Sequence, residues 1–235
     1  MFDASIVATV SPRDRLRDAR LYLVCDARPR AFLDAALAGG VDVVQLRDKT
    51  LDDPGLIEAA RPFRAAADAH GALFILNDRP DLVEACAADG VHVGQDDSTP
   101  SQARGRVGPE RIVGRSTHAP GQADAALADP DVDYLAAGPV HATPTKPGRP
   151  AVGLDYVAYV ARATRRADAK PWFAIGGLDP VTVGAVVEAG AQRIVVVRAI
   201  TDAADPGAAA RSLRTTLTAA PPRSGREERV GAAQP

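Results

Sequence analysis

The chain has 235 residues, 46% of them hydrophobic and 25% charged, which is enough apolar material for one large domain with a single core. Its net charge of −2 excludes the strongly basic surface of a nucleic-acid-binding protein and gives no sign of attachment to anionic lipid, so we expect neither nucleic acid nor membrane as a partner. No apolar run approaches the roughly 20 residues that cross a bilayer, and the N-terminus lacks a basic segment followed by an apolar one, so we expect a cytoplasmic protein.

Composition divides the chain into three parts. Residues 1–19 are mixed in polarity and rich in charge, and they predict an N-terminal arm or a short helix across the bottom of the domain. From residue 20 to 217, short aliphatic or β-branched runs alternate with alanine-rich stretches of about 10 to 20 residues. Residues 218–235 lack apolar periodicity, and we expect a disordered tail there.

Eight apolar runs in the middle part predict eight β-strands. They cover residues 21–25, 41–46, 72–76, 90–93, 111–114, 132–137, 172–175 and 193–197. The stretches between them predict helices, because prolines stand at first-turn positions and glycines just past helix ends. These residues are Pro80, Pro100 and Pro180, and Gly39, Gly40, Gly71, Gly90 and Gly190. Pro62 predicts a kink or break in the helix before the third strand.

This alternation favours an α/β fold with a parallel sheet covered by helices. Strands that are apolar on both faces are typical of such sheets. Eight strand–helix units favour a closed (β/α)8 TIM barrel, spanning residues 20–217, over an open doubly wound sheet.

Polar residues follow the predicted strands at the end where barrels of this kind carry their function. The segments are Gln45-Leu46-Arg47-Asp48-Lys49, Asn77-Asp78-Arg79, Gly94-Gln95-Asp96-Asp97, Arg115-Ser116-Thr117-His118, the loop 138–150, Gly176-Gly177 and Arg198. Because the strands are parallel, these segments meet at one mouth of the barrel. We therefore expect a single site there.

Two aspartates at neighbouring strand ends suit a divalent cation. Asp78 and Asp97 can approach one point, and Mg²⁺ prefers a few hard oxygens together with water and phosphate oxygens. The alternative is helix capping, by Asp78 before Pro80 and by Asp97 before Thr99. Asp96 competes with Asp97 for the metal.

Positive charge and free backbone N–H groups at the same mouth predict phosphate binding. Arg47, Lys49 and Lys146 come from different loops, as a diphosphate would need, although each alone could be a solvated surface charge. Gly176-Gly177 follows the seventh strand, where barrels often bind a monophosphate through backbone N–H groups; a plain tight turn is the alternative. The loop 138–150 offers more hydrogen-bond donors than acceptors, although a proline-stiffened connection would have the same composition.

No histidine is assigned a role from the sequence. His118 and His141 fall in candidate site loops and could transfer protons, whereas His70 and His92 are interpreted as structural. Dinucleotide, P-loop, nucleophile-elbow and zinc-protease motifs are absent from the sequence.

Six segments, in order, resemble the thiamine phosphate synthase family. They are residues 44–49, 77–78, 90–97, 114–118, 138–139 with 143–146, and 174–178, and the resemblance extends from about residue 20 to 217. It implies a transferase that joins 4-amino-2-methyl-5-hydroxymethylpyrimidine diphosphate to 4-methyl-5-(2-hydroxyethyl)thiazole phosphate, or to its carboxylated precursor. The products would be thiamine phosphate and pyrophosphate.

The resemblance also implies roles for individual residues. Contacts to the pyrimidine diphosphate would be Gln45, Leu46, Arg47, Asp48, Lys49, Asn77, Ser116 and Lys146, of which Lys49, Ser116 and Lys146 would be catalytic. Asp78 and Asp97 would hold Mg²⁺, and Thr143, Pro144, Thr145 and Gly177 would contact the thiazole phosphate. Where the family usually ends the eighth strand with a small hydroxyl residue, this chain has Val197-Arg198, and both are added as candidate phosphate contacts.

The implied chemistry agrees with this inventory. The pyrimidine amino group can stabilise a cation at the exocyclic methylene, so the bond to diphosphate can break before the thiazole nitrogen attacks. Mg²⁺, Lys49 and Lys146 would then stabilise the departing pyrophosphate by charge.

Two other functions stay open. A thiazole tautomerase on the same scaffold could use His118, but it has no need of two metal-type aspartates or of a diphosphate-binding segment 45–49. A non-catalytic sensor of phosphorylated ligands is the other, because a fold does not prove catalysis. The sequence also leaves open whether the chain forms a homo-oligomer.

Overall fold

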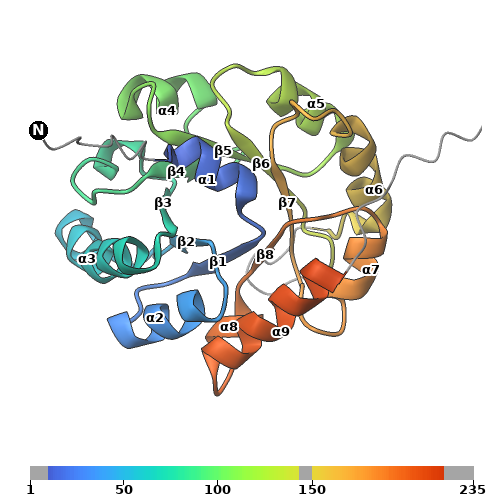
Figure 1. The fold of residues 1–235 in the computed structure, drawn as a ribbon. Helices are drawn as coiled ribbons and strands as arrows, with labels where there is room; N and C mark the ends of the chain where they lie inside the picture. Colours follow the sequence, from blue (N-terminus) through green and yellow to red (C-terminus); the bar gives the residue numbers. More distant parts are fainter. Residues whose placement is uncertain (1–9, 143–149, 220–235) are drawn as a thin grey trace, which may run out of the picture.

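The computed structural model describes residues 10–142 and 150–219, and these form a closed barrel of parallel strands surrounded by helices (Figure 1). The strands pair in chain order, and the first closes on the last. They are β1 (Leu21–Cys25), β2 (Val43–Leu46), β3 (Leu73–Asn77), β4 (Gly90–Val93), β5 (Ile112–Thr117), β6 (Tyr134–Ala137), β7 (Trp172–Ile175) and β8 (Ile194–Val196). The predicted (β/α)8 barrel is confirmed. One boundary matters for the site: β5 continues past Gly114, so Ser116 lies in the strand and not in a loop.

Helices cover the outside of the barrel. They are α1 (Pro12–Asp18), α2 (Arg30–Ala38), α3 (Asp53–His70), α4 (Pro100–Val107), α5 (Pro120–Ala128), α6 (Gly153–Ala163), α7 (Val183–Glu188), α8 (Arg198–Thr201) and α9 (Pro206–Ala219), with a 3-10 turn η1 (Pro80–Leu82). None of the helices within the described ranges has the length and apolar character that crossing a bilayer requires.

Two expectations about the helices differ from the structure. α3 runs through Pro62 without a break, and its buried face, which includes Ala60 and Phe63, holds it against the barrel. After β3 the chain forms only the short η1, not an α-helix. The segment leading to β4 is short, and Ala87 there adopts a left-handed conformation (φ 50°) that no α-helix continues through.

The core has two layers because successive strand residues face opposite sides of the barrel wall. The outer layer lies between strands and helices and contains residues such as Leu23, Leu46 and Phe74. The inner layer fills the barrel and contains Tyr22, Val43, Leu73, Ile112, Tyr134 and Phe173. Leu16 and Ala19, from α1 and its end, are buried in this inner layer, so α1 closes one end of the barrel (Figure 1).

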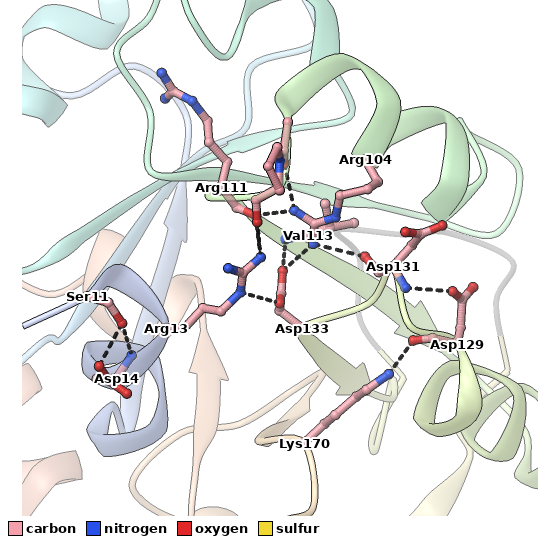
Figure 2. Close-up of polar contacts among 12 residues, drawn as sticks. Ser11, Arg13, Asp14, Arg104, Arg111, Val113, Asp129, Asp131, Asp133 and Lys170 are labelled. Atoms are coloured by element: carbon pink, nitrogen blue, oxygen red, sulfur yellow. Dashed lines mark hydrogen bonds and ion pairs between the residues drawn. The ribbon is translucent and has the colours of Figure 1, made fainter.

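The closed end is held by aspartates that directly precede even-numbered strands. Asp42, Asp89 and Asp133 accept hydrogen bonds from the backbone N–H groups of Leu21, Phe74 and Val113, at 2.9, 2.8 and 2.8 Å. Figure 2 shows the third: Asp133 lies between Arg13 of α1 and Arg104 of α4, with N···O distances of 2.8 and 2.6 Å. One carboxylate therefore ties α1, α4 and β5 together.

Candidate active site

The open end of the barrel contains a cavity of about 680 Å³ lined by residues from all eight strands or the loops that follow them. Ten of the residues predicted from the sequence line it: Gln45, Arg47, Lys49, Asn77, Asp78, Asp97, Ser116, Gly177, Val197 and Arg198. Residues of β2 and of the start of α8 are far apart in the chain, yet they line the same cavity. The structure places these side chains together, and their individual roles stay predictions.

Other predicted contacts are not placed in the cavity. The Leu46 side chain is fully buried in the outer layer, because it follows Gln45 in β2 and so faces the opposite side of the wall. Asp48 does not line the cavity either: its carboxylate accepts hydrogen bonds from the Thr50 N–H and hydroxyl at 2.9 and 2.7 Å. Thr143, Pro144, Thr145 and Lys146 lie outside the described residues.

An acidic pair lies at the ends of β3 and β4. The Asp78 carboxylate accepts a hydrogen bond from the Asn77 amide at 2.6 Å and lies 3.5 Å from the Lys49 ammonium. Burial of Asp78, and secondly the neighbouring Asp97 carboxyl group, raise the pKa of Asp78 above its ordinary value. The Asp78 and Asp97 carboxyl groups therefore lie close together in a partly buried site, where two negative charges repel each other.

The capping alternative does not account for these aspartates. α4 is capped by the Thr99 side chain, which accepts from Gln102 N–H, while Asp97 accepts from Gly94 N–H at 2.9 Å. η1 has no side-chain cap at all.

The donor set fits Mg²⁺. Hard carboxylate oxygens that repel each other are relieved by a divalent cation, and Mg²⁺ commonly takes one or two carboxylates and fills its other positions with water and substrate phosphate. In ranges 10–142 and 150–219 no group of three or more His, Cys, Asp or Glu side chains is placed to hold a metal. Asp78 and Asp97 would therefore supply the carboxylate ligands of Mg²⁺ and leave its other positions to further oxygens.

Across the mouth, the ends of β7 and β8 bring backbone groups close to the cavity. Gly176 and Gly177 have φ of 108° and 64°, and a Cβ at Gly177 would lie 2.7 Å from the His141 Cβ. Only glycine meets both conditions here. Val197 and Arg198 line the same side, where α8 begins. This is the place at which many barrels bind a phosphate.

The floor of the cavity holds polar residues that the sequence analysis did not select. Tyr22, Gln95, His92 and His118 line the cavity, and the structural interpretation of His92 stays a prediction. His92 hydrogen-bonds to Ser116 Oγ at 2.9 Å and to Tyr134 Oη at 3.0 Å. The sequence does contain a signal: His92 alternates with Val91 and Val93, which face the helices, so its side chain faces inward.

Comparison with known proteins shows the family. Residues 21–200 match the model of the family described as thiamine monophosphate synthase. The thiamine-phosphate synthase of Thermobifida fusca is 53% identical over 213 residues, covering 88% of this chain and 96% of that protein. The thiamine-phosphate synthase of Thermus thermophilus is 53% identical over 205 residues, covering 84% of this chain and 97% of that protein.

A solved structure agrees with these relatives. The thiamine phosphate pyrophosphorylase of Pyrococcus furiosus superposes with a TM-score of 0.76 at 28% identity, covering 88% of this chain and 97% of that one. The chain therefore belongs to the thiamine monophosphate synthase family.

Proposed function

We propose that this chain is a thiamine-phosphate synthase that condenses the hydroxymethylpyrimidine diphosphate with the thiazole phosphate and releases pyrophosphate. The observation that carries the proposal is a single cavity whose two sides carry different chemical groups. One side has the Asp78–Asp97 pair beside Lys49 and Arg47, which suits a diphosphate with Mg²⁺. The other has Gly176-Gly177 and Arg198, which suits a monophosphate.

Opposite placement of these sides follows from the barrel itself. In a ring of eight strands, β3 and β7 lie four positions apart and therefore face each other across the mouth. Two substrates anchored by their phosphates at opposite rims would present their ring systems to each other in the centre. Holding reactants in this way removes much of the entropic cost of a bimolecular step.

Asp78 and Asp97 would hold Mg²⁺, which, when bound, would neutralise charge on the diphosphate as it leaves. Lys49, on the same rim, adds a positive charge, and we assign Lys146 the same task from the loop after β6. Gln45 and Ser116 project into the cavity from β2 and β5, where the aminopyrimidine ring would lie. Since the amino group of that ring can stabilise a cation at the methylene carbon, we propose that the diphosphate leaves before the thiazole nitrogen attacks.

The test is release of pyrophosphate by the purified chain. We expect release only when both substrates and Mg²⁺ are present. Release without the thiazole phosphate, or none with all three components, would contradict the proposal. Calorimetry should show that the pyrimidine diphosphate binds in a Mg²⁺-dependent way, which a tautomerase would not require.

Variants at the acidic and basic groups test the assignment of roles. Asp78→Ala or Lys146→Ala should lower turnover at saturating Mg²⁺ by about 10²-fold to 10³-fold, the usual cost of losing one preorganised charge contact. Asp68→Ala is the matched control, because Asp68 lies on α3 and pairs with Arg64 on the outer surface. Full activity in either test variant would remove that residue from the mechanism.

A further inference from the structure

Five buried polar side chains form one continuous chain of hydrogen bonds under the cavity. Gln45 Nε2 lies 2.6 Å from Tyr22 Oη, which lies 2.9 Å from Tyr134 Oη. Tyr134 Oη lies 3.0 Å from His92 Nδ1, and His92 Nε2 lies 2.9 Å from Ser116 Oγ. All five residues are buried, and we call this chain of contacts the inner relay.

The inner relay joins five strands through the barrel interior, in the order β2, β1, β6, β4 and β5. Its two ends, Gln45 and Ser116, line the cavity, whereas Tyr134 lies beneath it. The tyrosines are held by aromatic packing: Phe173 contacts the rings of Tyr22 and Tyr134 edge-on, with centroids 5.4 and 5.7 Å apart. The hydroxyl positions are therefore fixed by the apolar core.

The direction of the inner relay follows from its first member. An amide nitrogen only donates, so Tyr22 accepts from Gln45, and Tyr134 Oη is then the acceptor within the inner relay for the hydroxyl proton of Tyr22. Burial raises the pKa of both phenols, so both keep a proton to give. In this direction Tyr134 donates to His92 Nδ1, and Nδ1 is then the unprotonated ring nitrogen.

The last step determines what Ser116 shows to the cavity. A neutral imidazole that accepts at Nδ1 carries its proton on Nε2, and that N–H donates to Ser116 Oγ. Ser116 therefore accepts from below and has its hydroxyl proton left for the cavity. At the other end, Gln45 uses its amide nitrogen on Tyr22 and keeps its carbonyl oxygen as an acceptor.

We propose that Tyr22, Tyr134 and His92 are positioning residues that orient Ser116 as a hydrogen-bond donor and Gln45 as an acceptor toward the pyrimidine substrate. The inference rests on the proposed function for the identity of that substrate. An aminopyrimidine offers both complements at its edge, a donating amino group and accepting ring nitrogens. The inner relay would fix Ser116 as the donor and Gln45 as the acceptor. A ring whose donors and acceptors are exchanged would then bind more weakly.

The first arm of the test is spectroscopic and needs no substrate. NMR of the isotope-labelled imidazole nitrogens, with the His92 signals identified by comparison with His92→Gln, reports which nitrogen carries the proton. We expect the neutral ring protonated at Nε2 in the ligand-free protein. A proton on Nδ1, or a doubly protonated ring, would mean that the relay does not run as inferred, and would overturn the proposal.

The second arm is kinetic and uses isosteric removal of one hydroxyl. Tyr134→Phe should lower kcat/KM for the pyrimidine diphosphate by about tenfold, the effect of one buried hydrogen bond, and leave KM for the thiazole phosphate unchanged. Tyr22→Phe is a second variant with the same expected direction. Tyr156→Phe is the matched control, because Tyr156 is also buried and donates to Thr117 Oγ1 at 2.8 Å, but in the outer layer.

The two arms separate this inference from the proposed function. If the unmodified chain releases pyrophosphate and both relay variants match the Tyr156→Phe control, the relay is overturned while the function stands. If the unmodified chain is inactive with both substrates, the proposed function fails, and the imidazole measurement still decides the direction of the relay. Melting curves of the three Phe variants show whether a loss of activity reflects loss of fold.

Discussion

The Asp78 carboxyl group lowers the stability of the folded protein, whereas we expect it to support activity. It adopts a left-handed backbone conformation, φ 60°, which Asp tolerates better than most residues, and its carboxyl group is partly buried beside Asp97. Removing a charge from water and placing it beside a like charge costs free energy in the folded state. A divalent cation bound between the two carboxylates would relieve this repulsion. The site therefore lowers the stability of the folded protein only while no cation is bound.

The raised pKa of Asp78 gives a pH-dependent prediction. The folded protein keeps this proton over a pH range in which the unfolded chain has released it, so stability falls as pH rises through that range. Asp78→Asn removes the titration and keeps the shape. In Mg²⁺-free buffer we expect its Tm to exceed that of the parent at neutral pH, with the difference disappearing toward pH of about 4, the ordinary carboxyl pKa.

Thermal melts over this pH range check the expectation. Asp68→Asn on the exposed face of α3 is the control and should show no gain in Tm as pH rises. A lower Tm for Asp78→Asn than for the parent at neutral pH would contradict the argument.

Gly114 shows how one missing side chain shapes the cavity floor. A Cβ at this position would lie 2.2 Å from the Tyr134 ring and 2.5 Å from its hydroxyl oxygen. Tyr134 can therefore reach His92 only because position 114 has no side chain. The requirement is one of space, because Gly114 has no left-handed φ.

Gly114→Ala should accordingly destabilise the protein by about 1–3 kcal/mol through overpacking. Urea unfolding monitored by circular dichroism measures the free energy. Gly105→Ala is the control: it lies within α4 with open space around its Cβ, and it should stabilise by about 0.5–1 kcal/mol. Equal stability of the Gly114 variant and the parent would show that Tyr134 does not need this space.

At the scale of elements, the closed end of the barrel is organised by carboxylates that satisfy strand N–H groups. Asp133 accepts from Val113 N–H and pairs with Arg13 and Arg104, so it joins a strand to two helices (Figure 2). Its side chain is only 13% exposed, which reduces screening by water. Removing it would leave two arginines and a backbone N–H without their shared acceptor.

We expect Asp133→Ala to lower the free energy of unfolding by about 3 kcal/mol, the cost of breaking a buried pair on one side. The KM values should stay unchanged, because Asp133 precedes β6 at the end opposite the cavity. Asp168→Ala is the control, since its pair with Arg166 is largely exposed and should contribute nothing measurable. If Asp133→Ala lowers the free energy of unfolding as little as Asp168→Ala does, α1 is held by its apolar contacts alone.

At the scale of the whole molecule, parallel strands place stability and chemistry at opposite ends of one barrel. The closed end has α1 and the bound aspartates, and the open end has the acidic pair, the glycines and the inner relay below them. The buried Asp78 carboxyl group costs stability at the open end, whereas the Asp133 carboxylate supplies stability at the closed end. A substitution at the open end should therefore leave the contribution of the closed end to the free energy of unfolding nearly unchanged.

A double variant tests this separation. Because sites at opposite ends share no partners, changes in unfolding free energy for Asp78→Ala and Asp133→Ala should add to within about 0.5 kcal/mol. The activity of the double variant should equal that of Asp78→Ala alone at a temperature where both are folded. Strong non-additivity in urea unfolding would show that the barrel transmits strain between its ends.

The sequence alone was enough to identify the barrel, its open end and its family. Alternating apolar runs and glycine-marked helix ends are local signals, and parallel strands bring their C-terminal residues to one side whatever the details. Asp78, Asp97, Lys49 and Gly177 could therefore be predicted to meet in one cavity, and they do.

Only the tertiary structure decided which side of the barrel wall each strand residue faces. Strands apolar on both faces carry little alternation in hydrophobicity, so Tyr22 and Tyr134 resembled ordinary core residues. Their partnership depends on barrel closure, which brings β1, β4 and β6 around one interior, and on the space at Gly114. Contacts across a barrel are set by three-dimensional geometry, and no local pattern in the chain encodes them.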